Sequence, residues 1–336
     1  MASTAAGPET SASLTDATEL IAPELEQIER LVLEEARSEV EVLQEAAHHI
    51  LSSGGKRLRP QLLLMATLAS GGDLQRGVPL AGAAELVHTA TLVHDDIVDE
   101  SDSRRGRVAV QFYFGNSASV MMGDFLVVRA FGLIGREPSR EIWDLMVETI
   151  ARMCEGEVLQ ICVKSDLNCG LDVYETIIDC KTAVLMAACT RIGGMLGGVS
   201  PAEQEALQAF GYNIGMAFQI TDDILDFIGD EETLGKPVGG DLREGKVTLP
   251  VIYALEDAAP EARQELVALY ERTGPLSTAD ISRSTEIIRE AGGFERSRQY
   301  ALAYIEEGRR QLRLTRPHPA REALFALADQ IVDRRR

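Results

Sequence analysis

The sequence predicts an all-α fold organised as one helical domain. Ala, Leu, Glu and Arg dominate the chain of 336 residues, and these residue types favour helix. Aromatic residues make up only 5%, and no alternation of apolar and polar residues persists long enough to indicate a sheet. Hydrophobic residues account for 45%, which is enough for a large core, and no linker divides the chain. We therefore expect a single bundle of helices.

The elements follow from apolar spacing and from helix-ending signals. Residues 1–18 are rich in Ala, Ser and Thr and are predicted to form a disordered extension before a domain over 19–336. Apolar faces then indicate two helices, of which the second ends at Gly54-Gly55. Further helices are predicted over about 60–70, 78–103, 116–135, 139–167, 172–196, 201–229, 248–257, 260–273, 279–292, 294–314 and 319–333. The main irregular stretch inside the domain is 229–248.

Charge and cysteine content narrow the function classes. The net charge of −20 disfavours a nucleic-acid partner, and it also means that any phosphate site must be locally basic or loaded with metal. The five cysteines are odd in number and lack a metal-ligand spacing, as expected in a reducing compartment. The N-terminus lacks the layout of a signal peptide, and uninterrupted apolar runs are too short to cross a membrane. We expect a cytoplasmic protein with no transmembrane segment.

A repeated acidic motif is the main chemical signal. The motif reads DDIVD at 95–99 and DDILD at 222–226, each time inside apolar sequence. Residues four apart share a helix face, so Asp95 and Asp99 point the same way, as do Asp222 and Asp226. Like charges this close repel, and cations would relieve the repulsion. Mg²⁺ typically binds through one or two carboxylates plus substrate phosphates. Two facing helices that hold a diphosphate through Mg²⁺ would explain both copies.

A simpler interpretation remains for one copy alone, because a single motif of this kind is more often a solvated acidic face. The two copies together, both in windows that read as buried, favour the metal site. Calcium loops of the EF-hand type require a glycine at the sixth position, which neither segment has.

Basic residues accompany the carboxylates in four segments. The loop GGKRLRP at 54–60 contains Lys56 and Arg59, although a surface loop would look the same. Arg104 and Arg105 follow the first motif and could be salt-bridge partners or a phosphate-binding pair. The other two segments contribute Lys181, Thr182, Gln219, Lys236 and Lys246. A lysine with its stem on apolar surface is the usual alternative for each.

Two histidines lie near the first motif. His88 is seven residues before Asp95, hence on the same helix face, and could equally be a ligand contact or a core residue. His94 lies about 100° off that face, which favours a structural role. The sequence has no Ser-His-Asp arrangement and no Walker phosphate loop, so P-loop phosphoryl transfer is disfavoured.

Taken in order, these segments resemble the trans-isoprenyl diphosphate synthases, or polyprenyl synthetase family. The resemblance runs from about residue 20 to the C-terminus. Within the family, the chain is similar above all to the octaprenyl-type synthases of quinone biosynthesis. It is carried by GGKRLRP (54–60), ELVHTATLVHDDIVDESDSRRG (85–106), GNSASVMMGDF (115–125), KTA (181–183) and FQITDDILDFIGDEETLGKPVGGDLREGKVTLP (218–250). Val247 stands where proline is common, and the N-terminal extension has no counterpart.

The resemblance implies an isoprenoid synthase fold around a deep central cavity, usually as a homodimer, with two or three Mg²⁺ ions. It assigns Asp95, Asp99, Asp222 and Asp226 to metal. It assigns Arg104, Lys181, Thr182, Gln219 and Lys236 to the allylic diphosphate, and Lys56, Arg59, His88 and Arg105 to isopentenyl diphosphate. The reaction implied is head-to-tail condensation of isopentenyl diphosphate with an allylic diphosphate.

Product length depends on the helix face before the first motif. Thr91 lies one turn, about 5.4 Å, before Asp95, and Val87 lies two turns before. A Phe or Tyr at position 90 or 91 would close the path of a growing tail, but this chain has Ala90 and Thr91. We expect a medium-to-long product, hexaprenyl to decaprenyl, for a quinone side chain. The floor would lie deeper, at Met121, Met122, Phe125 or Phe131. Alternatively, the small residues merely permit close helix packing.

Four other functions stay open. The chain could be a short-chain synthase making farnesyl or geranylgeranyl diphosphate, or a non-catalytic subunit of a heteromeric synthase. A terpene cyclase shares the fold, but its second metal motif usually differs. A purely structural metal-binding protein would need none of the basic segments. The sequence does not define the preferred allylic primer, the exact product length or the downstream pathway.

Overall fold

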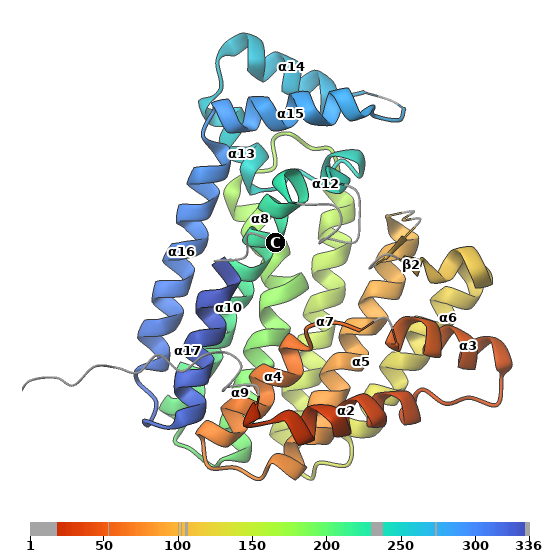
Figure 1. Cartoon of the computed structure of the whole chain (residues 1–336), viewed down its shortest axis with the longest axis vertical. Helices are drawn as coiled ribbons and strands as arrows, with labels where there is room; N and C mark the ends of the chain where they lie inside the picture. The colour runs from red at the N-terminus through yellow and green to blue at the C-terminus, as the bar shows by residue number, and fades with distance from the viewer. Residues whose placement is uncertain are drawn as a thin grey trace, which may run out of the picture.

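The computed structural model describes residues 19–52, 54–99, 101, 103–104, 107–229, 238–272 and 274–332. Its elements are almost all helices, as predicted (Figure 1). The first half comprises α2 (Ala22–Glu35), α3 (Glu41–Leu51), α4 (Leu58–Ala69), α5 (Leu74–Val98), α6 (Val110–Ile134) and α7 (Arg140–Cys162). The second half comprises α8 (Leu171–Ile178), a π-helical turn (Asp179–Ala183), α9 (Val184–Leu196), α10 (Pro201–Ile228), α12 (Gly240–Arg243), α13 (Leu249–Asp257), α14 (Pro260–Tyr270), α15 (Thr278–Glu290), α16 (Gly293–Leu312) and α17 (Pro319–Val332).

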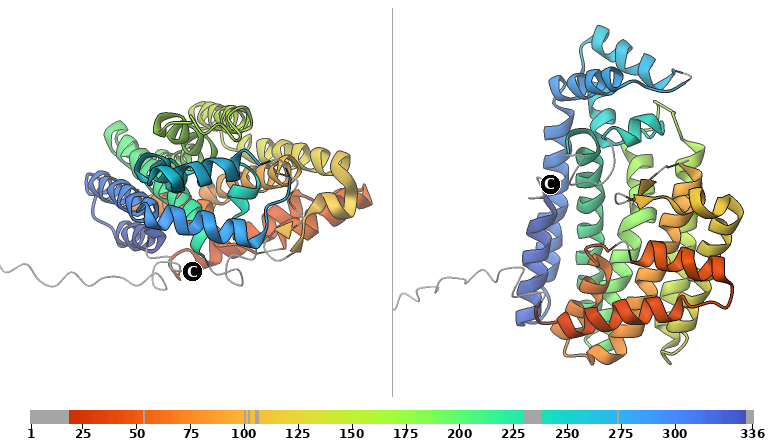
Figure 2. Two further views of the ribbon diagram at one scale, coloured as in Figure 1. Left: turned by 90° about the horizontal axis from the view of Figure 1, so that it is seen from above. Right: turned by 45° about the vertical axis from the view of Figure 1, so that its right-hand side comes forward.

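The long helices form one bundle around a shared core. α4 packs against α5 and α9, α5 against α6, and α10 against α9 and α16. α2 crosses the lower end of the bundle in Figure 1. Seen from above, α14 and α15 lie across the opposite end (Figure 2). The two acidic motifs therefore occupy the upper ends of two core helices, α5 and α10.

Local sequence explains where these two helices begin and how closely the core packs. Asp73 caps α5 by accepting a hydrogen bond from the backbone N–H of Gln75. Ser200 and Glu203 form a capping box at the start of α10. Glycine permits the closest approach between α9 and α4, because a Cβ on Gly193 would lie 2.5 Å from the Cβ of Ala66.

Several predicted boundaries were wrong near the acidic motifs. The helix predicted over 78–103 ends at Val98 and is followed by a two-residue hairpin, in which β1 (Ser103–Arg104) pairs antiparallel with β2 (Arg107–Val108). α6 starts six residues before the predicted position 116, and Gly115 interrupts its geometry with a φ of 79°. The segment predicted as one helix over 172–196 contains the π-helical turn. α3 ends at Leu51, before the glycine pair.

A second, smaller core lies under the upper helices. It contains Phe227, Leu242, Val251, Ala254, Leu266, Tyr270, Ile281, Ile287 and Ile288. These side chains come from the end of α10 and from α12 to α15. The segment after the second acidic motif is thus anchored in a core distinct from that of the main bundle.

Within the described ranges, one helix, α6, is long and apolar enough to cross a membrane by length and composition alone. The prediction of no transmembrane segment rests on uninterrupted apolar runs, which are shorter than this helix. In the structure, α6 packs along α5 as a member of the bundle. The boundary between an N-terminal extension and the domain at residue 19 stays a prediction, because residues 1–18 lie outside the described ranges.

Candidate active site

Two carboxylates of the second acidic motif are buried and accept hydrogen bonds from uncharged donors. The hydroxyl of Tyr174 donates to Asp223 Oδ2 at 2.7 Å, and the side-chain amide of Gln219 donates to Asp223 Oδ1 at 2.9 Å. The backbone N–H of Asp241 donates to Asp226 Oδ2 at 2.9 Å. Asp223 and Asp226 are both buried, whereas Asp222 is half-buried. The motif therefore keeps its negative charges close together in a poorly solvated place.

Burial governs the titration of this motif. The pKa of Asp223 is raised to about 6, mainly by burial, with a smaller contribution from the charges of Asp222 and Asp226; the hydrogen bonds from Tyr174 and Gln219 oppose the shift. A cation bound beside the motif would favour the ionised carboxylates. The electrostatics thus fit a metal site better than a structural acidic face.

Three residues predicted to bind the allylic diphosphate lie next to the second motif. The Thr182 hydroxyl donates to Gln219 Oε1 at 2.7 Å, so Gln219 connects Thr182 to Asp223. Lys181 Nζ lies 2.5 Å from Glu157 Oε2 and donates to Gln160 Oε1 at 3.2 Å. Lys181 and Thr182 belong to the π-helical turn, whose wider winding is frequent at functional sites.

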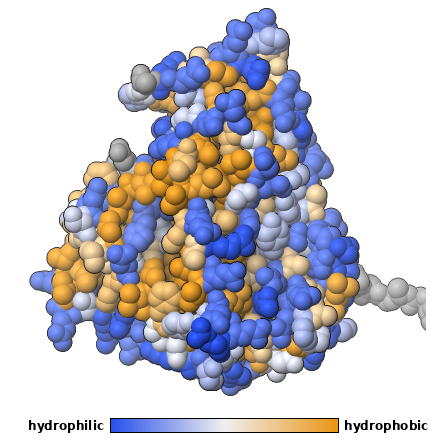
Figure 3. Space-filling model, turned by 180° about the vertical axis from the view of Figure 1, so that it is seen from behind, coloured by the Kyte–Doolittle hydropathy of each residue, from blue (hydrophilic) through white to orange (hydrophobic). Residues whose placement is uncertain are grey.

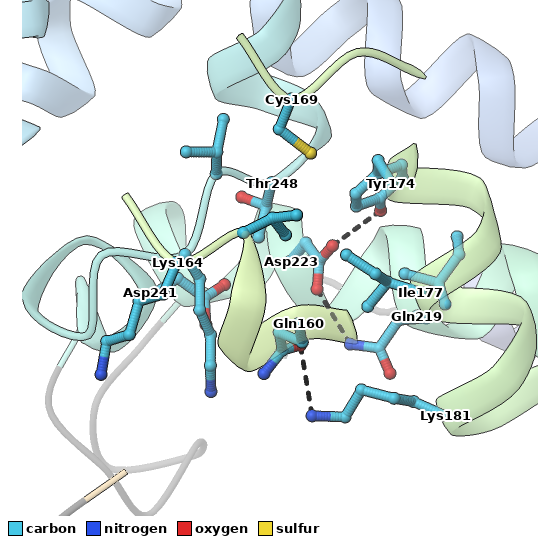
Figure 4. A pocket seen from close by; sticks show the side chains of 14 residues that line it. Gln160, Lys164, Cys169, Tyr174, Ile177, Lys181, Gln219, Asp223, Asp241 and Thr248 are labelled. Atoms are coloured by element: carbon cyan, nitrogen blue, oxygen red, sulfur yellow. Dashed lines mark hydrogen bonds between the residues drawn. The ribbon is translucent and has the colours of Figure 1, made fainter. Parts of the chain in front are cut away.

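Several of these side chains, including Lys181 and Gln219 but not Thr182, border one cavity of about 100 Å³, shown in Figure 4. Its lining comes from the end of α7, from α8, from the π-helical turn, from α10 and from the segment 241–248. Asp223, Lys181, Gln219, Asp241 and Lys246 are among the lining residues. Carboxylates and ammonium groups therefore meet at one concave site.

The first acidic motif ends beside the same site. Lys246 Nζ lies 2.8 Å from Asp99 Oδ2 and 2.5 Å from Glu244 Oε2. Burial alone would lower the pKa of Lys246, but the carboxylates of Glu244, Asp99 and Asp241 outweigh it and hold that pKa well above its usual range. Lys246 is thus a charged link between the end of α5 and the segment before α13. It brings the two acidic motifs to the same region.

The residues predicted to bind isopentenyl diphosphate come from neighbouring elements. Arg59 is buried on α4, His88 is half-buried on α5, and Lys56 is exposed in the preceding loop. α4 and α5 pack together, so the three residues lie in the same region of the bundle. Arg57, which lies between Lys56 and Arg59 in the sequence, forms a buried ion pair with Glu85 at 2.5 Å and therefore has a structural role.

Three predicted residues cannot be placed by their side chains. Arg105 and Lys236 lie outside the described residues. Arg104 is described only by its backbone, in β1. His94 contacts α6, where its Nε2 is 3.1 Å from the carbonyl oxygen of Val120, which agrees with a structural role.

The residues predicted to control product length lie mainly in the core. Val87 and Ala90 are fully buried, and Thr91 is half-buried with its hydroxyl donating to the carbonyl oxygen of His88 at 2.8 Å. On α6, Met122 is buried, and Phe125 and Phe131 pack against the core. Met121 is 58% exposed, so its expected place at a cavity floor was wrong: it lies on the outer surface of this chain.

Four contributors escaped the sequence analysis. Three of them lie on helices before α10, where no sequence motif marks them: Tyr174 on α8, and Glu157 and Gln160 on α7. Asp241 was visible in the sequence GGD after the second motif, and its acidic side chain in a glycine-rich loop was a usable signal.

Known proteins share these features. Residues 40–288 match the family described as polyprenyl synthetase. The octaprenyl diphosphate synthase of Escherichia coli K12 is 37% identical over 325 residues, covering 96% of this chain and 100% of that protein. A short chain isoprenyl diphosphate synthase of Methanothermobacter thermautotrophicus is 38% identical over 301 residues, covering 88% of this chain and 91% of that protein.

A solved structure agrees with the fold. The polyprenyl synthase of Caulobacter crescentus CB15, complexed with calcium and isoprenyl diphosphate, superposes with a TM-score of 0.91 at 38% identity, covering 98% of this chain and 100% of that one. The match extends over the helices that carry both acidic motifs. The chain belongs to the polyprenyl synthetase family and is a trans-prenyl diphosphate synthase, an enzyme that transfers prenyl groups.

Proposed function

We propose that this enzyme elongates an allylic diphosphate with isopentenyl diphosphate to a hexaprenyl-to-decaprenyl product. The observation that carries the product length is the small pair Ala90 and Thr91, one turn before the first acidic motif on α5. The relatives include both an octaprenyl and a short-chain synthase, so similarity alone does not decide between long and short products. A quinone side chain is the destination we infer for a product of this length, and the cytoplasm is the compartment.

Magnesium is the cofactor we propose. Asp95 and Asp99 on α5 and Asp222 and Asp226 on α10 would hold it, with Asp241 beside them. All of these groups are oxygen donors, which hard divalent cations prefer, and the Caulobacter relative was solved with calcium. Bound there, the metal supplies Lewis-acid polarisation of the diphosphate leaving group.

The residues of the chain supply binding, orientation and exclusion of water. Lys181 contributes positive charge where the allylic diphosphate departs, and Thr182 and Gln219 orient it. The allylic C–O bond breaks, and the electron pair leaves with the diphosphate. The double bond of isopentenyl diphosphate attacks the resulting cation, and a proton then passes to the departing diphosphate. Buried apolar residues such as Val87 and Ala90 keep water from quenching the cation.

The test is an assay of the purified protein with Mg²⁺, labelled isopentenyl diphosphate and a series of allylic primers. Chromatography of the dephosphorylated products should show chains of hexaprenyl to decaprenyl length, and chelation of the metal should abolish them. A product no longer than geranylgeranyl would establish the short-chain function instead. No product from any primer would favour a subunit that needs a partner.

The two diphosphates should depend on different residues. Lys56→Ala and Arg59→Ala should mainly raise the KM for isopentenyl diphosphate, because they belong to the α4 side of the bundle. Lys181→Ala should mainly raise the KM for the allylic substrate, because Lys181 borders the cavity beside the second motif. Equal effects on both KM values in all three variants would reject this division.

A homodimer is the assembly we propose, with α6 and α7 as its interface. Both helices expose large apolar side chains in this chain: Phe112, Tyr113, Val120, Met121, Val128, Val147, Val158 and Ile161. Figure 3 shows a broad area of hydrophobic surface on the face seen from behind. Contiguous apolar surface of this kind marks interaction sites. Sedimentation of the wild type should give a dimer, and Val128→Arg should weaken it; a wild-type monomer would contradict the proposal.

A further inference from the structure

The hydroxyl of Thr248 is a polar group without a structural use. Thr248 is 7% exposed, and its Oγ1 has no hydrogen-bond partner among the described residues. Buried hydroxyls are ordinarily paired, because losing water without a replacement costs stability. An unpaired buried hydroxyl at a cavity therefore indicates a group reserved for a ligand.

Helix capping does not occupy this hydroxyl, although Thr248 is the N-cap residue of α13. A threonine N-cap usually accepts a hydrogen bond from the backbone N–H of the second or third helical residue. The second is Pro250, which has no N–H. The third, Val251, donates its N–H to the backbone carbonyl of Thr248 at 2.9 Å. Both usual donors are thus unavailable to the side chain.

The surroundings of Thr248 point to an anionic ligand. Thr248 lines the same cavity as Lys181, Gln219 and Lys246, as Figure 4 shows for the labelled residues. Two neighbouring groups are already engaged: Lys181 with Glu157, and Gln219 with Thr182 and Asp223. Three lysines, Lys164, Lys181 and Lys246, line the cavity beside Asp223 and Asp241, and their ammonium groups attract phosphate oxygens, which accept hydrogen bonds strongly. A hydroxyl beside them is suited to donate to such an oxygen.

We propose that Thr248 binds the diphosphate group of the allylic substrate through a hydrogen bond donated by its hydroxyl. This role rests on the proposed function, because the cavity is the one assigned to the allylic diphosphate. Thr248 is then a substrate-binding residue, and its unpaired state without substrate is the cost of keeping the donor available.

Two substitutions separate binding from folding. Thr248→Val keeps the shape and removes the hydroxyl, whereas Thr248→Ser keeps the hydroxyl. The readouts are the dissociation constant of inorganic pyrophosphate with Mg²⁺ by calorimetry, the KM of each substrate, and the unfolding temperature without ligand. Thr285→Val is the matched control, because Thr285 is also a buried threonine, but its hydroxyl donates to the carbonyl of Ile281 at 2.8 Å in α15.

Thr248→Val should raise the dissociation constant of pyrophosphate and the KM of the allylic substrate by about tenfold, the usual effect of one hydrogen bond to a charged group. Thr248→Ser should stay close to the wild type. The KM of isopentenyl diphosphate should not change in either variant. The unfolding temperature of Thr248→Val should be equal to or above that of the wild type, because an unpaired polar group has been removed.

The opposite pattern would overturn the proposal. If Thr248→Val lowered the unfolding temperature and bound pyrophosphate normally, the hydroxyl would be structural. If Thr248→Ser lost binding as Thr248→Val does, the hydroxyl would not be the binding group. A wild-type protein that forms no prenyl product would instead sink the proposed function, so the two failures are distinguishable.

Discussion

The two acidic motifs share a pattern of residues but differ in what surrounds them. The first, on α5, ends in Asp99, which is paired with the ammonium group of Lys246. The second, on α10, contains Asp223 and Asp226, which accept hydrogen bonds from a phenol, an amide and a backbone N–H. Asp99 of the first motif is therefore partly neutralised by a cation from the chain itself, whereas Asp223 and Asp226 of the second motif accept hydrogen bonds from uncharged groups.

This difference shows how one chain could prepare the two walls that we propose for metal binding. Hydrogen bonds from Tyr174 and Gln219 fix the position of the Asp223 carboxylate in the second motif. The ion pair between Lys246 and Asp99 connects the end of α5 to the segment before α13. We expect it to hold the two walls in position before substrate binds. The residues just before each motif differ as well: Thr91 precedes the first by one turn, and Phe218 precedes the second. Only the first wall leaves small side chains along the path of a growing chain.

The largest effect on turnover should come from removing the first aspartate of either motif. We expect Asp95→Ala and Asp222→Ala each to lower kcat by about 10²–10³, because each deletes charge stabilisation that acts in the transition state. Circular dichroism should show an intact fold. Asp144→Ala, an exposed carboxylate on α7, should leave kcat unchanged. Near-normal turnover in either motif variant would mean that the two walls do not share one metal site.

The charged link of the first motif should matter for stability. Lys246→Met leaves the half-buried carboxylates of Asp99 and Glu244 without their cation; because loss of one partner from a fully buried pair costs about 3 kcal/mol, we expect a loss of about 1–3 kcal/mol. Urea unfolding should show this loss. Arg140→Met removes a partner of Asp144 at the surface and should change the free energy of unfolding by no more than about 0.5 kcal/mol. A similar small change for Lys246→Met would show that Lys246 does not hold the walls together.

The neutral support of the second motif should have a smaller effect. Tyr174→Phe removes one of two donors to Asp223 and should cost about 1–2 kcal/mol of unfolding free energy. Tyr253→Phe is the control, since Tyr253 is also buried but its hydroxyl makes no hydrogen bond within the described part of the chain. Equal unfolding free energies for the two variants would contradict a supporting role for Tyr174.

Product length should change with little effect on rate when the first wall is filled. Thr91→Phe should shorten the product, because Thr91 is half-buried one turn before Asp95, whereas Thr91→Val should not. Ala90→Phe should shorten it too, but Ala90 is fully buried, so this variant should also lose about 1–3 kcal/mol of stability through overpacking. Chromatography of the products decides: unchanged length in both Phe variants would mean that the tail does not pass α5.

The sequence was sufficient for the helices and for the acidic and basic motifs, because both depend on local spacing. The α10 helix and its capping box follow directly from Ser200, Glu203 and the apolar period. Tyr174 could not be predicted, because its partner Asp223 is distant in sequence and the bond depends on how α8 packs on α10. Met121 was misplaced for a related reason: spacing alone does not say which face of α6 packs against α5. The unused hydroxyl of Thr248 required the hydrogen-bond pattern of the folded chain.

The second core has a consequence for the cooperativity of this protein. The end of α10 and helices α12 to α15 contribute to a second set of buried apolar side chains, although α13 also contributes Leu249, Ile252 and Tyr253 to the main core. Proteins can open in cooperative units that are smaller than the whole chain. The segment 241–248, which carries Asp241, Lys246 and Thr248, packs on the second core through Leu242 and Val247. We therefore expect amide hydrogen exchange in this segment to follow that of the helices of the second core.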